Sequence, residues 1–302
     1  SNSFYSVSDG RVLRAAGFAM ASASAEGTFA SAAETGEGWD DVSNECAEEE
    51  DEGSKGITLV PIGDGVKTVV CFGDSNTYGS WGRGDKQGER MPYSTRWTSV
   101  LQNVLGASAI VIPEGLRGRT TVLDDPHNWA NSGMVDAGAA NGKRYLLPCL
   151  NSHKPVDLVV LALGCNDLKT RFALTPAEIA KGCQCLIREI RASACGPGNA
   201  APLIVLVSPP AVRLSFEFHP DFGQQRHHRS LATIEAYRKL AEEEELAGFV
   251  SLEPVPTSDD GLHFDEESSA AIGNAVAQAV SPVLAVDASN GQARKKRRIV
   301  WA

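Results

Sequence analysis

The sequence predicts an α/β fold, a three-layer α/β/α arrangement around a five-stranded parallel sheet. The first observation is that strand and helix signals alternate from Lys67 onward, which is typical of a parallel sheet with helices on both faces. The second is a continuous apolar run, Val69-Val70-Cys71-Phe72, which is typical of a strand buried on both sides. Right-handed crossovers limit the topologies, and five strands then favour the flavodoxin-like order 2-1-3-4-5.

Each element is predicted from its local run of residue types. Strands are predicted at Thr68–Phe72, Ala109–Ile112, Asp157–Leu163, Leu203–Val207 and Phe249–Leu252. Helices are predicted near Thr95–Leu105, Lys143–Ser152, Ala177–Ser193, Ser230–Ala247 and Glu266–Val280. The third of these helices follows Thr175-Pro176, the order of cap and proline expected at a helix N-terminus. Functional sites in such sheets form beyond the carboxyl ends of the strands.

Four segments are predicted along the chain. They are a disordered acidic extension at 1–56, a linker at 57–66, the folded domain at 67–284 and a basic tail at 285–302. The extension is rich in Ser, Ala, Gly and Glu, and it has too little apolar surface to offset the entropy lost on ordering. A remnant of a transit peptide at Arg11–Ala25 is the alternative for part of this extension.

The charge of the chain is negative and uneven. The 302 residues carry a net charge of −10, with an acidic run at Glu45–Glu52 and a basic cluster at Arg294–Arg298. Because the middle of the chain is close to balanced, we expect no nucleic-acid groove in the folded domain. No apolar run approaches the length of a membrane span, so no membrane contact is expected.

The spacing of the cysteines and the nature of the N-terminal residues predict the cellular compartment. Seven cysteines at irregular spacing do not match a disulfide framework. We expect them to be small core residues in a reducing environment, with Cys183 and Cys185 on different faces of a helix. No secretory signal opens the sequence, which favours a cytoplasmic protein. The basic cluster makes a nuclear address one alternative, and organellar targeting is another.

Polar residues follow the first and third predicted strands. Ser75, in Gly73-Asp74-Ser75, would sit where a strand turns into a helix, so free N–H groups there could hold an oxyanion. A plain helix cap is the alternative for this serine. After the third strand, Asn166 is either an oxyanion donor or an ordinary turn residue.

A carboxylate and a histidine follow the fifth predicted strand. His263 has the side chain needed for a base near neutral pH, and Asp260 lies three residues earlier, where it can bend back to orient the imidazole. Asp259 and Asp265 compete for that role, and a solvated acidic turn is the alternative. The serine, asparagine and histidine after alternate strands together favour nucleophilic catalysis.

Four sequence blocks now resemble the SGNH (GDSL-type) hydrolases, in the order of that family. They are GDSN at 73–76, GLRGRTT at 115–121, GCND at 164–167 and DGLH at 260–263. The resemblance covers about residues 67–282. Stretches such as EGLRGRTT, DDP at 124–126, NGKRYLLPCL and VSPP are similar to the small bacterial arylesterase and acyltransferase branch. One departure is Asn76, where many members carry leucine.

The resemblance implies residue roles and a reaction. Ser75 would be the nucleophile, His263 the base and Asp260 the acid that orients it. The oxyanion hole would combine Ser75, Gly118 and Asn166, with Gly118 favoured over Gly115 in the glycine block. An acyl-enzyme would then be hydrolysed by water or passed to an alcohol, with no metal or cofactor. The resemblance also implies a homo-oligomer.

Short-acyl esters, acetyl or aryl, are the expected substrates, and acetylated carbohydrates are the alternative. A non-catalytic binding module on the same fold is the alternative of another class. Substrate contacts are predicted, from loops above the sheet, at Asp74, Asn76, Tyr78, Trp81 and Phe216. Further aromatic candidates are Trp129, Phe218 and Phe222. The segment Arg213–Arg229 is the candidate lid or interface element, and metal binding at His227-His228 is disfavoured.

Overall fold

The computed structural model describes residues 65–82, 86, 89–127, 137–213 and 221–289. The predicted acidic extension at 1–56, the linker before Gly65 and the tail beyond Ser289 lie outside these residues. Phe216, Phe218 and Trp129 also lie outside them.

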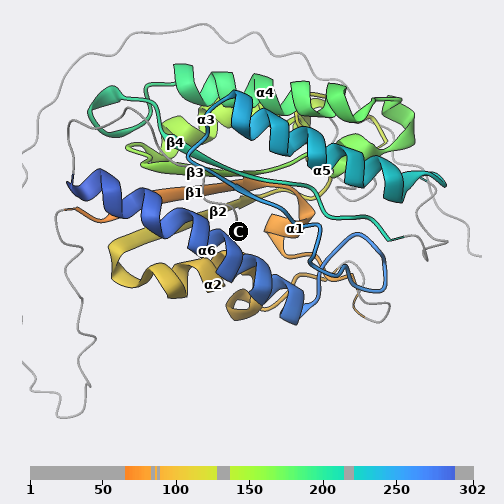
Figure 1. The fold of residues 1–302 in the computed structure, drawn as a ribbon, viewed down its shortest axis with the longest axis horizontal. Helices are drawn as coiled ribbons and strands as arrows, with labels where there is room; N and C mark the ends of the chain where they lie inside the picture. The colour runs from red at the N-terminus through yellow and green to blue at the C-terminus, as the bar shows by residue number, and fades with distance from the viewer. Residues whose placement is uncertain (1–64, 83–85, 87–88, 128–136, 214–220, 290–302) are drawn as a thin grey trace, which may run out of the picture. The chain divides into compact units, whose positions relative to one another are not determined.

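A five-stranded parallel sheet forms the centre of the domain (Figure 1). Its strands are β1 (Lys67–Gly73), β2 (Ala109–Gly115), β3 (Leu158–Ala162), β4 (Leu203–Val207) and β5 (Gly248–Val250). The order β2-β1-β3-β4-β5 confirms the predicted fold class and topology. The last residue of β1, Gly73, pairs with Gly115 of β2 and Ala162 of β3, so three strands end at the same level.

Helices cover both faces of this sheet (Figure 1). They are α1 (Ser75–Tyr78), α2 (Trp97–Leu105), α3 (Gly142–His153), α4 (Pro176–Ala192), α5 (Arg226–Glu243) and α6 (Glu266–Ser289). Short 3₁₀ turns are found at Tyr93–Thr95, Gly106–Ser108, Ala137–Ala140, Asn166–Leu168, Thr170–Phe172 and Pro197–Asn199. Helices α2 and α6 lie together on one face, and α3, α4 and α5 lie on the other (Figure 1).

Strand β1 shows why its apolar run is continuous. Val70 and Phe72 belong to the core on the side of α3, α4 and α5, whereas Val69 and Cys71 belong to the core on the side of α2 and α6. All four side chains are fully buried. A strand covered on both faces therefore needs apolar residues at every position.

Helix α5 begins four residues before the predicted start at Ser230. That serine does not cap the helix, because its hydroxyl lies inside α5, where it donates to the His227 carbonyl and accepts from the Val212 N–H at 3.0 Å. Arg226–Arg229, which we assigned to a lid or interface element, is therefore the first turn of α5. The rest of that segment is described only at Arg213 and 221–225.

Helix α6 extends past its predicted end at Val280 and reaches Ser289. Val283 and Leu284 remain buried beyond Pro282, so the apolar face continues through the proline. At α4 the predicted cap is present, since the Thr175 hydroxyl accepts from the Glu178 N–H and the Glu178 carboxylate accepts from the Thr175 N–H.

The cysteines of the described ranges are free thiols. Cys183 is buried and Cys185 is exposed, as expected for different faces of α4. The prediction that the cysteines are core residues is therefore wrong for Cys185. Among the helices that the structure describes, none has the length and apolar character needed to cross a membrane.

Candidate active site

Ser75 lies at the turn between β1 and α1. The preceding Asp74 caps the helix, because its carboxylate accepts a hydrogen bond of 3.0 Å from the Asn76 N–H. Gly79, with φ of +88°, ends α1 after a single turn. Ser75 is therefore the first residue of a short helix at the carboxyl edge of the sheet, with 9% of its surface exposed.

Two hydrogen bonds connect Ser75 to a histidine and an aspartate from the loop between β5 and α6. The Nε2 atom of His263 lies 2.9 Å from the Ser75 Oγ, and its Nδ1 atom lies 2.5 Å from the Asp260 Oδ2. The three residues come from the two ends of the domain sequence. The parallel sheet places the ends of β1 and β5 at the same edge, and the loop before α6 spans the distance left by β3 and β4.

The Asp260 carboxylate fixes the histidine in place. Its Oδ1 accepts from the N–H groups of Leu262 at 2.9 Å and His263 at 2.8 Å, while its Oδ2 faces the ring. Burial acts to raise the pKa of Asp260, but the hydrogen bond and charge of His263 outweigh it and lower that pKa. An ionised carboxylate can only accept, so Nδ1 carries the proton and Nε2 accepts from the serine hydroxyl.

Asp259 and Asp265, the two alternatives for the orienting acid, have other surroundings. Asp259 is exposed. Asp265 caps α6, because its Oδ1 accepts from the Ser268 N–H at 2.8 Å. Of these three aspartates, Asp260 is the one that contacts the imidazole.

The three predicted oxyanion donors come from neighbouring loops. Gly118 adopts a φ of +78°, a conformation that favours glycine. Within the part of the chain that the structure describes, the N–H groups of Ser75 and Gly118 make no hydrogen bond. The Asn166 side-chain amide donates to the Arg119 carbonyl at 3.1 Å, which places it beside Gly118 and leaves it a second N–H.

Arg119 ties the glycine loop to the serine turn, a role that the sequence did not reveal. Its guanidinium donates to the Gly73 carbonyl at 2.9 Å and also to the Glu114 carbonyl. The Leu116 N–H donates to the same Gly73 carbonyl at 3.1 Å. Since Gly73 is two residues before Ser75, these bonds fix the spacing between the nucleophile turn and the glycine loop.

Further carboxylates hold the glycine loop against the Asn166 turn. The fully buried Asp167 accepts from the N–H of Thr121 at 3.0 Å and from its hydroxyl at 2.5 Å. Asp125 forms ion pairs with Lys169 at 3.0 Å and Arg171 at 2.7 Å. Burial acts to raise the pKa of Asp125, but hydrogen bonds from these two cations lower it. Asp125 belongs to the DDP stretch at 124–126, which is part of the family resemblance, but the sequence did not predict its ion pairs.

The two glycines of the glycine block have different tasks. A Cβ atom at Gly115 would lie 2.2 Å from the Tyr78 N atom and 2.5 Å from the Thr77 carbonyl carbon. Gly115 therefore lets α1 pack directly on the end of β2. Gly118 instead supplies a free N–H at a positive φ.

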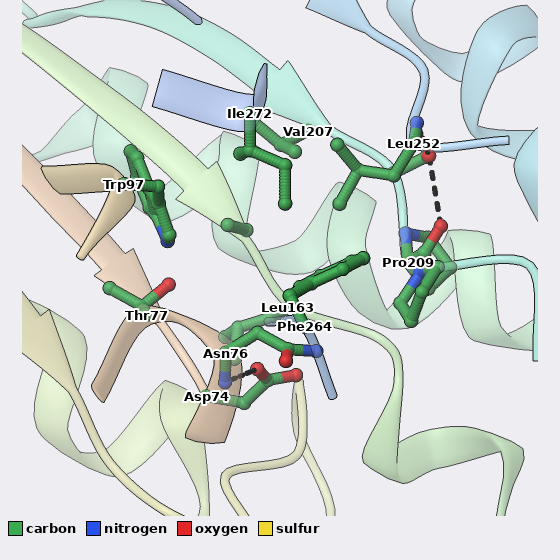
Figure 2. Close-up of a pocket in the computed structure, with 13 residues that line it drawn as sticks. Asp74, Asn76, Thr77, Trp97, Leu163, Val207, Pro209, Leu252, Phe264 and Ile272 are labelled. Carbon is green, nitrogen blue, oxygen red and sulfur yellow. Dashed lines mark hydrogen bonds between the residues drawn. The ribbon is translucent and has the colours of Figure 1, made fainter. Parts of the chain in front are cut away.

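Asp74 and Asn76 line a small cavity behind the nucleophile turn (Figure 2). Its volume is about 20 Å³, enough for roughly one water molecule. Apolar side chains of Trp97, Leu163 and Phe264 form much of its wall, and neither Ser75 nor His263 lines it. Burial raises the pKa of Asp74 to about 6. Asn76 donates weakly to the Leu262 carbonyl at 3.4 Å, and its own carbonyl oxygen has no partner in the described residues.

The rings of Tyr78 and Trp81, two predicted substrate contacts, each lie against a basic side chain. Tyr78 is covered by Arg90, whose guanidinium carbon lies 4.0 Å from the ring centre, and Lys86 lies 4.7 Å from the ring centre of the buried Trp81. Phe222 lies in the loop between β4 and α5, as predicted, but its side chain is buried in the core packed against α5, which favours a packing role over a substrate contact.

Comparison with known proteins gives consistent matches for the domain. The model of the GDSL-like lipase/acylhydrolase family matches residues 71–271. The structure is similar to the native aryl esterase of M. smegmatis, at 36% identity and a TM-score of 0.63, covering 72% of this chain and 99% of that one. It is also similar to Est24, a carbohydrate acetylesterase from Sinorhizobium meliloti, at 35% identity, a TM-score of 0.64 and the same coverage. Among curated protein sequences, none matches the chain.

Proposed function

Because the chain belongs to the GDSL-like lipase/acylhydrolase (SGNH) family and is a GDSL-type esterase, we propose that it hydrolyses short-acyl esters, acetyl or aryl, through an acyl-enzyme on Ser75. The observation that carries the assignment of Ser75 is the continuous hydrogen-bonded chain from its hydroxyl through His263 to Asp260.

The proposed first half-reaction forms the acyl-enzyme. His263 Nε2 takes the proton of the Ser75 hydroxyl as its Oγ attacks the ester carbonyl carbon. The negative charge that develops on the carbonyl oxygen is held by the N–H groups of Ser75 and Gly118 and by the free N–H of Asn166. As the bond to the alcohol breaks, His263 gives its proton to the leaving oxygen.

The second half-reaction frees the enzyme. A water molecule gives a proton to His263 as its oxygen attacks the acyl carbonyl. The second tetrahedral adduct then collapses to the acid, and His263 returns the proton to the departing Ser75 Oγ. Asp260 stays ionised throughout, because it stabilises the imidazolium without accepting its proton. An alcohol in place of water would give acyl transfer by the same steps.

The test is a chain-length series of p-nitrophenyl esters from acetate to octanoate, run on the wild type and on Ser75→Ala. We expect acetate or butyrate to be cleaved fastest and the variant to lose nearly all of the rate. A wild type that is inert would favour the non-catalytic binding module. A variant that keeps its rate would refute the assignment of Ser75.

Acetylated carbohydrate is the second candidate substrate, favoured by the 35% identity to the carbohydrate acetylesterase Est24. Both candidates share the acetyl group and differ in the alcohol. Turnover compared between acetylated xylose and phenyl acetate separates them, since kcat/KM reports how well the alcohol part is held in the transition state.

A homo-oligomer, in which neighbouring subunits restrict the acyl pocket, and a cytoplasmic location are parts of the same proposal. A monomer in solution scattering would refute the first. The cytoplasmic location is tested by imaging the tagged full chain with and without Arg294–Arg298. A nuclear signal that is lost when these residues are removed would show a nuclear address instead.

A further inference from the structure

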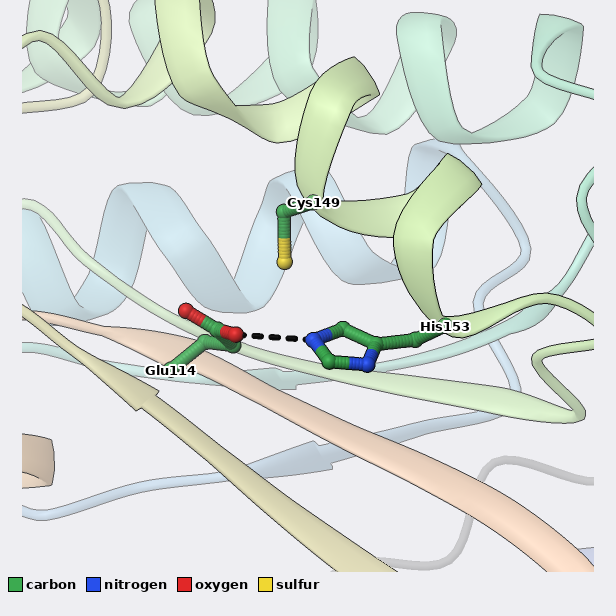
Figure 3. Close-up of side chains that lie close together, drawn as sticks. All are labelled: Glu114, Cys149 and His153. Atoms are coloured by element: carbon green, nitrogen blue, oxygen red, sulfur yellow. Dashed lines mark hydrogen bonds and ion pairs between the residues drawn. The ribbon is translucent and has the colours of Figure 1, made fainter.

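Glu114, Cys149 and His153 gather into a cluster that the esterase mechanism does not use (Figure 3). Glu114 lies near the end of the edge strand β2, while Cys149 and His153 lie four residues apart on one face of α3. One donor atom from each residue lies within 4.8 Å of the other two. In Figure 3 the thiol of Cys149 points toward the carboxylate and imidazole, which contact each other at 2.8 Å.

From this geometry we propose that Glu114, Cys149 and His153 bind one divalent transition-metal ion of the Zn²⁺ type. A sulfur, an imidazole nitrogen and a carboxylate oxygen are a donor set suited to zinc, whereas Mg²⁺ and Ca²⁺ take oxygen ligands. Zinc bond lengths of about 2.0–2.3 Å in a tetrahedron separate ligand atoms by roughly 3.3–3.7 Å. The three donor atoms therefore need to move by only about 1 Å to surround an ion.

The surroundings of the cluster support binding at this place. The side chains of Glu114 and His153 are 19% and 27% exposed, so an ion can reach them, while Cys149 is buried behind them. The Tyr145 hydroxyl, one turn before Cys149 on α3, donates to the Glu114 Oε2 at 3.3 Å. It orients the carboxylate as partners outside a metal's ligand shell do. A water molecule would occupy the fourth position.

Binding has to displace the Cys149 thiol proton and to overcome the positive charge of the nearby Arg119. A thiolate formed beside a carboxylate is costly by itself, but a divalent ion neutralises both and releases the thiol proton to solvent. The simpler interpretation is a Glu114–His153 ion pair next to a core cysteine, and it requires no thiolate.

Titration with Co²⁺ distinguishes these two interpretations, because a cobalt–thiolate bond gives a charge-transfer band in the near ultraviolet. The full chain, without a polyhistidine tag and freed of metal by a chelator, is titrated with Co²⁺ and then with Zn²⁺. The variants are Cys149→Ser and His153→Gln. Cys185→Ser is the matched control, because it removes an exposed thiol outside the cluster.

We expect the wild type and Cys185→Ser to bind one Co²⁺ with a thiolate band that Zn²⁺ removes. Cys149→Ser should lose the band, and His153→Gln should bind at least about 10-fold more weakly, the lower limit for loss of a supporting partner. Zn²⁺ should also raise the melting temperature of the wild type more than that of His153→Gln. A wild type without the band, or a band that survives Cys149→Ser, would overturn the proposal. Neither readout depends on esterase activity.

Discussion

Asp260→Asn tests the proposed catalytic roles at the atom that sets the histidine tautomer. Because Asp260 Oδ1 accepts from two backbone N–H groups at 2.8 and 2.9 Å, the amide oxygen of an asparagine must take that place. Its NH₂ group then faces His263 Nδ1 and donates to it. The imidazole proton moves to Nε2, which can no longer accept from Ser75.

The expected loss in kcat is about 10⁴-fold, the cost known for this exchange in a serine–histidine–aspartate triad, which equals about 5.5 kcal/mol. The measurement is kcat and KM on p-nitrophenyl acetate, with the free energy of unfolding from urea titration as a check on folding. Asp259→Asn is the matched control, because it makes the same substitution at the neighbouring residue, whose side chain is exposed. A folded Asp260→Asn with near wild-type kcat, or an equal loss in Asp259→Asn, would refute the tautomer argument.

The remaining predictions concern the oxyanion donor, the packing of α1 and one buried carboxyl. Asn166→Ala should lower kcat about 10²–10³-fold with little change in KM, because its free N–H acts only on the charged transition state; a rise in KM alone would contradict this. Gly115→Ala should lower the free energy of unfolding by about 1–3 kcal/mol, since its Cβ would overlap the backbone of α1. Gly248→Ala, whose Cβ would meet its nearest atom at 3.4 Å, should show a smaller effect in the same urea titration. Asp74 has a folded pKa of about 6, above the unfolded value of about 3.9, so its contribution to stability falls as pH rises between the two. Asp74→Asn should therefore gain about 1–3 kcal/mol relative to wild type between pH 4 and pH 7, and a constant difference would argue against a raised pKa.

The strands and the catalytic residues were predictable because short stretches of sequence identify each of them. Val69–Phe72 is apolar at every position, as a strand between two cores must be. Ser75, Asn166 and His263 each follow a strand, and parallel pairing brings strand ends together whatever the intervening sequence does.

Contacts that depend on the paths of the loops were not predictable. The Asp125 ion pairs span more than 40 residues, and nothing near Asp125 identifies Lys169 as its partner. Arg119 works partly through its backbone carbonyl, which every residue has. Glu114 meets Cys149 and His153 only because α3 packs on the sheet over β1, next to the end of β2. Helix α5 begins four residues before the predicted start at Ser230, and the Ser230 hydroxyl accepts instead from the distant Val212 N–H.

Labelling by diisopropyl fluorophosphate, followed by intact-mass and peptide mass spectrometry, is a direct test of the catalytic serine. This reagent reacts with a serine only where a base activates it and oxyanion donors hold the phosphoryl oxygen. We predict one adduct per chain on the peptide that contains Ser75, no adduct in Ser75→Ala and much slower labelling in Asp260→Asn. No adduct on the folded wild type, or an adduct on another serine, would contradict the assignment of Ser75, His263 and Asp260.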